Sequence, residues 1–475
     1  MSETKINMER ISIRELQSAM EKGEITSYEI TCYYLNRIAK YDSVEGGLNS
    51  VLEVNPDALA IARKADLMRQ KGEVKGALHG VPVLLKDNVN TNDKNHTSAG
   101  SLSLKDNYAA YDAHITELLR EEGAVLLGKA NMTEFANILT VGMRNGYSSR
   151  GGCVLCPHNK EADPLGSSTG SAVAVAADLC TVSIGTETFG SIMSPARSNG
   201  VVGIKPTMGM VSRTGIIPIS HTFDTAGPFA RSVGDAAVLL NAITDYDESD
   251  PITYGAKKID VEKALSRSDI KGLRIGVHRN GEESLSPLNK KIMDEFFAEI
   301  IKNGAEIIEI EPQEMGVQLM DVVLPELKTD MNYYLSTTSD KVPYKTMEEI
   351  ILFNQANHKE ALKYGQQLFL RAQYEYSGGM TEASYIAALM KREEMIEKYK
   401  SIFEENMLDV LIPVVPNSIA AIMGFPSINL PLGYKEENTP IGSYWMGLPF
   451  EEEKLIGIVN MAEKIWNCKL VPQLD

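Results

Sequence analysis

Serine residues are concentrated in two turns of small residues between Pro164 and Thr207. The first turn is GSSTGS at positions 166–171, and the second spans positions 185–191. A serine hydroxyl at the mouth of such a turn is a candidate nucleophile. Backbone N–H groups in the same turns can point toward an oxyanion as it develops. The stretch therefore indicates nucleophilic chemistry, and the question is what makes one of these serines reactive.

Ser168 is the central residue of a G-x-S-x-G motif at positions 166–170, which is typical of the nucleophile elbow of α/β-hydrolases. That class of enzyme needs a histidine that follows the serine, normally late in the fold. The later histidines are His221, His278 and His358, and none lies in a loop that the sequence marks as catalytic. The motif is short enough to occur by chance, so a Ser-His-Asp mechanism fits this sequence poorly.

Lys86 is the leading candidate base if no histidine serves, as in Ser-Lys variants of the triad. It ends an apolar run within positions 78–88 that is typical of a strand buried on both faces. One interpretation is a lysine that reaches out to solvent at a strand end. The other is a buried lysine whose pKa is lowered by desolvation. The second is needed for catalysis, because a lysine with its ordinary pKa of about 10.4 is a poor base at neutral pH.

Helices and strands alternate around these residues, which predicts an α/β layered fold. Capping boxes at Ser12–Glu15 and Thr26–Glu29 predict two N-terminal helices. Further helices are predicted from Pro56 to about Arg69, at 113–122 and from Ser232 through Leu240. Later predictions include a strand at 123–128, a helix beginning within 131–136, a strand at 273–277, a helix at 289–302, a strand at 306–310, a mostly helical region at 315–406, a strand at 410–415 and a closing helix at 451–466.

The composition argues against two classes of partner. The 475 residues include 47 basic and 64 acidic side chains, for a formal net charge of −17. This acidic balance argues against a nucleic-acid partner and against adhesion to anionic lipid. No apolar run approaches the roughly 18 residues of a membrane span, and residues 1–11 lack the apolar core of a signal peptide. Five scattered cysteines, an odd number, predict no disulfide framework and a cytoplasmic location.

The sequence does not assign a clear role to two further segments. Cys153 and Cys156 form a lone CxxC near His158, but a structural zinc site would need a second pair. Pro157 also argues against a redox-active helix, so no metal or redox site is predicted there. The glycine- and serine-rich loop at 142–152 either lines a pocket or is a solvated connection.

Five successive blocks of the sequence resemble the amidase signature family. They are LHGVPVLLKDN, GKANMTEFA, DPLGSSTGSAVAVAA, GTETFGSIMSPARSNGVVGIKPT and DTAGPFARSVGDAA, and the late block GFPSINLPLG is similar to the C-terminal element of that family. The resemblance extends over roughly Ser12 to Trp466. GTETFGS together with RTGIIPIS is most similar to the peptide-amidase-like branch.

The resemblance implies a single amidase domain over residues 1–475, built on a large twisted mixed β-sheet with helices on both faces. It further implies a division into four parts: N-terminal helices at 1–70, a signature core at 71–240, an α/β and helical insertion on the substrate side at 241–409, and a C-terminal strand and helix at 410–475.

The resemblance also implies the chemistry, which is hydrolysis of a carboxylic amide to a carboxylate and ammonia or an amine. By this resemblance Ser191 is the nucleophile, Ser167 the relay serine on a cis peptide bond, and Lys86 the base. Ser168 supports the lysine and the relay by hydrogen bonds. The oxyanion hole is formed by backbone amides around Thr188, Phe189 and Gly190. No cofactor and no metal are expected.

Three positions depart from the family pattern and bear on the substrate. Leu165 replaces a glycine before the tandem serines, Phe189 replaces a residue that is usually glycine, and Met193 replaces the usual arginine. The expected partner is a small-molecule or peptide amide, bound by a monomer or homo-oligomer. Two alternatives stay open: the amidase subunit of a tRNA-dependent amidotransferase, and a non-catalytic binding protein on the same fold, which applies if Phe189 blocks the oxyanion hole.

Overall fold

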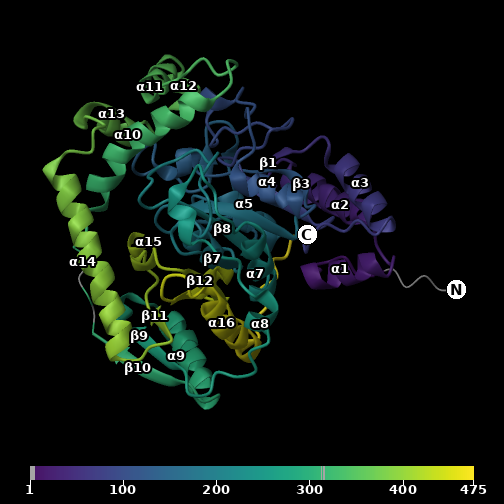
Figure 1. The fold of residues 1–475 in the computed structure, drawn as a ribbon, viewed down its shortest axis with the longest axis vertical. Helices are drawn as coiled ribbons and strands as arrows, with labels where there is room; N and C mark the ends of the chain where they lie inside the picture. The colour runs from purple at the N-terminus through teal and green to yellow at the C-terminus, as the bar shows by residue number, and fades with distance from the viewer. Residues whose placement is uncertain (1–5, 312, 314–315, 475) are drawn as a thin grey trace.

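One mixed β-sheet runs through the computed structural model, which describes residues 6–311, 313 and 316–474 (Figure 1). In this described part, eleven strands pair in the order β1-β3-β2-β6-β8-β7-β12-β13-β11-β9-β10, and β4 and β5 form a separate hairpin. The strands are β1 (Val51–Val54), β2 (Pro82–Lys86), β3 (Val125–Ala130), β4 (Tyr147–Ser148), β5 (Gly152–Cys153), β6 (Val182–Glu187), β7 (Val202–Lys205), β8 (Thr225–Ala230), β9 (Arg274–His278), β10 (Glu306–Ile310), β11 (Val410–Pro413), β12 (Ser427–Tyr434) and β13 (Pro440–Met446).

Parallel pairing is found in two groups of strands within this sheet. Strand β2 pairs parallel with β3 and β6, and β9 pairs parallel with β10 and β11. The strands between these groups pair antiparallel, from β6 through β8, β7, β12 and β13 to β11. The predicted α/β class with a large mixed sheet is confirmed.

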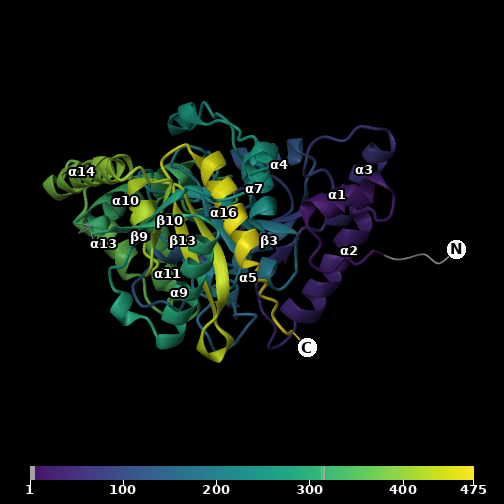
Figure 2. The same ribbon diagram turned by 90° about the horizontal axis from the view of Figure 1, so that it is seen from below.

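Helices surround the sheet, with α1–α3 gathered at one end of the molecule and α10–α14 at the other (Figures 1 and 2). Their bounds are α1 (Ile13–Glu21), α2 (Ser27–Arg37), α3 (Ala58–Gln70), α4 (His114–Glu121), α5 (Thr169–Ala176), α6 (Met193–Ser198), α7 (Val233–Ala242), α8 (Val261–Leu265), α9 (Pro287–Lys302), α10 (Leu319–Thr337), α11 (Met347–Ala356), α12 (His358–Ala361), α13 (Gln367–Glu375), α14 (Ala383–Glu405), α15 (Ile419–Met423) and α16 (Glu452–Trp466). No helix of the described residues has both the length and the apolar character that a bilayer-spanning helix requires.

Two hydrophobic clusters cover opposite faces of the sheet. In β11, Val410 and Ile412 belong to the larger cluster, whereas Leu411 between them belongs to the second. In β13, Trp445 and Met446 are divided in the same way. Because successive side chains of a strand point to opposite faces, the two clusters lie on either side of the sheet. The second cluster contains apolar side chains of α10, α11, α13, α14 and α15, so these helices cover one face.

The N-terminal helices begin where the sequence predicts. Ser12 accepts a hydrogen bond from the amide of Glu15, and the Glu15 carboxylate accepts one from the amide of Ser12. Thr26 and Glu29 form the same reciprocal pair at the start of α2. Each capping box satisfies two N–H groups that the helix itself leaves unpaired.

The prediction that a helix begins within 131–136 is wrong. Only a short 3₁₀ turn, Glu134–Asn137, is present, and Phe135 and Ala136 have φ values of 45° and 51° inside it. The left-handed backbone of Phe135 and Ala136 interrupts the helical path. It is held there by tertiary contacts, since the amide of Thr133 donates to the carbonyl of Ser167, at 3.1 Å, and the amide of Phe135 donates to the carbonyl of Ala99. Tertiary hydrogen bonds thus replace the helical ones in this segment.

The late part of the chain contributes to the same sheet as the early part. Strands β9 and β10 fall in the predicted insertion at 241–409, and they extend the sheet beyond β11. The region 315–406 is mostly helical as predicted, apart from position 315, which lies outside the described residues. The four-part division of the domain stays a prediction.

Candidate active site

The ends of two neighbouring strands bring the predicted site residues together. Strand β2 ends at Lys86 and β6 ends at Glu187, and the two strands are parallel neighbours. Their C-terminal ends therefore meet at the same edge of the sheet. The loop at 166–168 reaches this edge just before α5 begins, and it contributes two serines. The peptide bond between Gly166 and Ser167 is cis.

Lys86 lies within hydrogen-bond distance of both tandem serines. Its Nζ atom is 2.8 Å from Ser167 Oγ and 2.9 Å from Ser168 Oγ. The same atom is 2.9 Å from Thr186 Oγ1 and 3.2 Å from the carbonyl oxygen of Thr186. Both Lys86 and Ser167 are fully buried. The lysine therefore does not reach out to solvent, and the first of the two interpretations of Lys86 is wrong.

The protonation of Lys86 is set by its burial. Desolvation lowers the pKa of Lys86 to about 7, while the negative charges of Asp224 and Glu187 act in the opposite direction. A group with this pKa is present in large part as the neutral amine at neutral pH, and the neutral amine is the form that can accept a proton.

Ser168 has all of its hydrogen-bonding capacity committed. Its hydroxyl donates to the carbonyl oxygen of Thr186 at 2.9 Å and accepts from the amide of Thr186 at 3.1 Å. Its remaining acceptor position faces Lys86 Nζ. Among the described residues, no histidine forms a hydrogen bond with Ser168, so the partner that an elbow serine requires is missing there.

Ser191 lies in the turn that follows β6 and is partly exposed. Its carbonyl oxygen accepts a hydrogen bond from the amide of Ser168 at 3.2 Å, which joins the two serine-bearing turns. No described residue accepts a hydrogen bond from the backbone N–H groups of residues 188–191. Gly190 has a φ of +90°, a conformation that favours glycine. The turn thus presents a free hydroxyl beside unpaired amide donors.

Glu187 supports this turn and was missed by the sequence reasoning. Its Oε2 atom accepts from the amides of Ile192 and Met193, at 2.6 and 2.9 Å. The side chain is 1% exposed. It therefore holds the two residues that directly follow Ser191. The position of Glu187 in the sequence could have indicated this role. It is the one carboxylate in the block GTETFGS, whose other residues are small, hydroxyl-bearing or aromatic.

Asp224 and Thr186 were also missed. Asp224 accepts hydrogen bonds from the Thr188 hydroxyl at 2.6 Å and from the amides of Ile219 and Ser220 at 2.7 and 2.9 Å. Burial raises the pKa of Asp224 to about 6, against these hydrogen bonds. Because Thr188 lies 36 positions before Asp224, only the folded chain links Asp224 to the turn after β6.

The three departures from the family pattern lie around the serine turns. Leu165 has a φ of 53°, and its carbonyl oxygen accepts from Thr169 Oγ1 at 2.7 Å. Phe189 packs against the second hydrophobic cluster. The side chain of Met193 is buried. None of these three side chains forms a hydrogen bond with Lys86, Ser167 or Ser168 in the described part of the chain.

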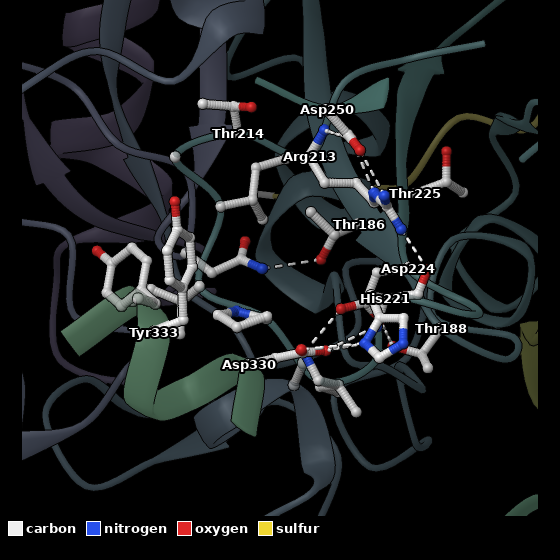
Figure 3. A pocket seen from close by; sticks show the side chains of 18 of the residues that line it. Thr186, Thr188, Arg213, Thr214, His221, Asp224, Thr225, Asp250, Asp330 and Tyr333 are labelled. Atoms are coloured by element: carbon white, nitrogen blue, oxygen red, sulfur yellow. Dashed lines mark hydrogen bonds and ion pairs between the residues drawn. The ribbon is translucent and has the colours of Figure 1, made fainter. Parts of the chain in front are cut away.

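A cavity of about 370 Å³ adjoins this cluster (Figure 3). Thr186 and Thr188 line it from the end of β6, and Asp330 and Tyr333 line it from α10. In Figure 3, Asp224, His221 and Asp330 lie on one side of the space and Tyr333 on the other. Thr186 is the link to the predicted base, since its hydroxyl is bonded to Lys86 Nζ.

One group of described residues has the spacing of a metal site, namely His221, Glu326 and Asp330, whose ligand atoms lie within 4.8 Å of one another. These atoms already bond to protein groups. His221 Nδ1 is 2.9 Å from Asp330 Oδ2, and Glu326 accepts from Thr222 Oγ1 at 2.5 Å and from Tyr385 Oη at 2.9 Å. The group is accounted for as a hydrogen-bonded network that joins α10 to the loop after β7.

The chain is similar to known proteins over almost its full length. A family model described as Amidase matches residues 29–422. A probable amidase of Arabidopsis thaliana is 38% identical over 470 residues, which cover 96% of this chain and 90% of the plant protein. The crystal structure of a peptide amidase from Stenotrophomonas maltophilia matches with a TM-score of 0.91 at 37% identity, covering 98% of each chain. A glutamyl-tRNA(Gln) amidotransferase subunit from Azorhizobium caulinodans is 33% identical over 501 residues, covering 96% of this chain and 97% of that protein.

Proposed function

The chain belongs to the amidase family, and on that premise we propose that it hydrolyses a carboxylic amide through an acyl-enzyme formed on Ser191. Ser167 relays the proton and Lys86 is the base. The observation that carries the proposal is the contact of 2.8 Å between Lys86 Nζ and Ser167 Oγ. A buried amine with a pKa of about 7 is suited to this role at neutral pH.

The first half of the reaction forms the acyl-enzyme. Neutral Lys86 takes a proton from Ser167 while Ser167 takes one from Ser191, and Ser191 Oγ attacks the amide carbon. The backbone N–H groups of Thr188, Phe189 and Gly190 stabilise the oxyanion, each donor being worth about 10²–10³ in rate. Collapse of the tetrahedral intermediate breaks the C–N bond, and the relay returns the proton to the leaving nitrogen as ammonia or an amine.

The second half is hydrolysis of the ester bond to Ser191. Water enters in place of the amine, and the relay of Ser167 and Lys86 takes its proton as it attacks. The carboxylate product then leaves with Ser191 protonated again. Ser168 contributes by keeping Lys86 in position, because its own hydrogen bonds to Thr186 hold its oxygen toward the amine.

Two observations favour Ser191 over Ser168 as the nucleophile. The Ser168 hydroxyl is fully buried and fully hydrogen-bonded, so an attack would first break contacts to Thr186. Ser191 is partly exposed, and its side chain has no hydrogen-bond partner among the described residues. An accessible hydroxyl next to unpaired amide donors suits acyl transfer, and the relay requires Ser191 to come within hydrogen-bond distance of Ser167 when substrate is bound.

The test combines turnover with chemical labelling. The purified chain is incubated with simple amides and peptide amides, and released ammonia is measured. A serine-directed fluorophosphonate is then mapped by mass spectrometry. We expect ammonia release that Ser191→Ala abolishes, and a label on Ser191. Ser168→Ala serves as the matched control: it should lower the rate but keep the label. A label on Ser168 would overturn the assignment.

A second candidate function rests on the similarity to the glutamyl-tRNA(Gln) amidotransferase subunit. In that case the chain would act within an assembly rather than alone. The two functions are separated by assaying the chain by itself. Turnover of free amides by the lone chain supports the amidase, whereas ammonia release that appears only with added partner subunits supports the amidotransferase.

A further inference from the structure

The cavity beside Lys86 is much larger than the space that a released ammonia molecule would occupy. It measures about 370 Å³, whereas a water-sized molecule takes up about 30 Å³. It begins at Thr186 and Thr188, which follow one another closely at the end of β6. One of these hydroxyls is bonded to the proposed base, and the other belongs to the proposed oxyanion turn.

The cavity lies next to the Ser167–Lys86 relay, and this position indicates whether it receives the acyl group or the leaving amine of the substrate. In the proposed reaction the leaving nitrogen receives its proton from Ser167, so that nitrogen must face the Ser167–Lys86 pair. Thr186 directly contacts Lys86 and also lines the cavity. A group attached to the leaving nitrogen would therefore extend along Thr186 into this space.

The walls of the cavity carry more negative than positive charge. Asp224 forms no ion pair with any described residue, although its carboxylate is buried. Asp250 is neutralised by Arg213, whose Nε is 2.8 Å from its Oδ2. Asp330 is paired with His221, which also contacts the buried carboxylate of Glu326 behind it. The charge of Arg213 acts on Asp224 and Asp330 as well. Among the described lining residues, three carboxylates, of Asp224, Asp250 and Asp330, thus face two basic groups, of Arg213 and His221. Excess negative charge in a partly enclosed space favours a cationic ligand.

An unpaired acceptor lies on the same wall. Asn88 is 2% exposed and lines the cavity, and its Nδ2 donates to Thr186 Oγ1 at 3.0 Å. Its Oδ1 accepts no hydrogen bond from any described residue. A buried acceptor without a partner is costly, so a shift of this side chain toward a donor on an incoming ligand would be favourable. Tyr333 lies at the opposite edge of the space from Asp224 (Figure 3).

We propose that this cavity receives the amine side of an N-substituted amide whose leaving amine carries a second, protonated nitrogen. The proposal rests on the proposed function, since it needs Ser167 to face the leaving nitrogen. The reaction is unchanged: the C–N bond breaks, the relay gives its proton to the leaving nitrogen, and a short diamine leaves instead of ammonia. Asp330 and Asp224 provide the complementary charge, and Asn88 provides an acceptor.

The test uses four amides that share one acyl group, chosen as the group whose primary amide releases ammonia fastest. The nitrogen carries either two hydrogens, an n-propyl group, a 2-aminoethyl group or a carboxymethyl group. The three substituents are similar in size and differ in charge. We expect kcat/KM for the aminoethyl amide to exceed the value for the propyl amide by about tenfold or more, with the carboxymethyl amide the poorest.

Two variants on α10 test whether the cavity causes the preference for the aminoethyl amide. Asp330→Asn should reduce the aminoethyl-to-propyl ratio of kcat/KM by about fivefold or more, because it removes a charge but keeps the shape. Asp321→Asn removes a carboxylate from the same helix at a position that does not line the cavity, and the ratio should stay at the wild-type value. The wild-type comparison of the four amides stands even if the Asp330 variant does not fold.

The outcomes separate this proposal from the one on which it rests. Hydrolysis of the primary amide with exclusion of all three substituted amides would overturn the cavity assignment and leave the amidase intact. Equal rates for the aminoethyl and propyl amides, or a preference for the carboxymethyl amide, would overturn the charge assignment. Failure to hydrolyse any of the four amides, whatever the acyl group, would overturn both.

Discussion

Lys86 Nζ lies 2.8 Å from Ser167 Oγ, although the two residues are separated by 81 positions in the sequence. Neither side chain is accessible to solvent. A charged amine in this position has no water around it, and this loss of hydration raises the free energy of the charged form. The lysine is therefore most stable here when it is neutral. The proposed mechanism depends on this one relationship.

The pH dependence of activity should report the titration of Lys86. Because the neutral amine is the active form and its pKa is about 7, kcat/KM should fall tenfold per unit below pH 7. The charge of Asp224 raises the pKa of Lys86. Asp224→Asn should therefore move the acid limb of the kcat/KM profile to lower pH, measured with one good amide substrate across the pH range.

Asparagine is a suitable replacement at position 224. Its carboxamide oxygen can accept from the two backbone amides, and its NH₂ group can donate to Thr188 Oγ1. Asp294→Asn, at an exposed position on α9, is the control and should leave the acid limb in place. An acid limb that moves to higher pH in Asp224→Asn would contradict the assignment of Lys86 as the titrating base.

The burial of Lys86 should also appear in the stability of the protein. Its pKa is lowered from 10.5 to about 7 in the folded state. Between these values the unfolded chain binds a proton that the folded chain does not, so the free energy of unfolding rises with pH in this window. Relative to Lys86→Met, wild-type stability should thus increase by several kcal/mol from pH about 6.5 to about 9.5. Urea unfolding at both pH values measures this difference.

An exposed lysine provides the comparison for that experiment. Lys398 lies on the exposed surface of α14, and Lys398→Met should change stability equally at both pH values. Lys86→Met should in addition abolish ammonia release at every pH. Parallel pH dependences for wild type and Lys86→Met would show that Lys86 titrates normally in the folded protein, which the proposed mechanism does not permit.

Glu187 should act as a positioning residue for the nucleophile turn. Glu187→Ala leaves the amides of Ile192 and Met193 without their acceptor, so we expect kcat to fall about 10²-fold with a smaller change in KM. Glu187→Gln keeps one oxygen that can accept from both amides and should recover most of the lost rate. A merely structural role would instead lower the melting temperature of both variants and leave kcat per folded molecule unchanged.

The left-handed backbone of Gly190 gives a further test of the same turn. A Cβ at this position would lie 3.2 Å from Ser194 Oγ and from Ser418 Oγ, at a φ of +90°. Gly190→Ala should therefore distort the amide donors and lower kcat by about 10²-fold. Gly23 has a φ of +71° with open space around it, so Gly23→Ala imposes backbone strain far from the site.

The two glycine variants separate strain from function. Both should lose about 1 kcal/mol of stability, as thermal or urea unfolding will measure. Only Gly190→Ala should lose activity per folded molecule and react more slowly with a fluorophosphonate. Equal activity in the two variants would mean that the backbone at position 190 does not position the oxyanion donors.

Local patterns were sufficient to predict several elements of the fold. The capping boxes at Ser12 and Thr26 begin helices where expected, because a capping box is satisfied by residues three positions apart. The apolar run before Lys86 is a fully buried strand, as its lack of alternation indicated. The segment at 131–136 was predicted wrongly, because its amides are held by hydrogen bonds to distant loops that no local pattern reveals.

The sequence by itself determined the family, the α/β class and the identity of the candidate residues, since these depend on residue types in ordered blocks. The tertiary structure alone decided which of two interpretations of Lys86 holds, because desolvation depends on what the surrounding chain packs over the amine. It also decided the partners of Asp224 and Glu187 and the extent of the cavity along α10. Such contacts join segments that are far apart in the chain, and only the pairing of strands into one sheet places them side by side.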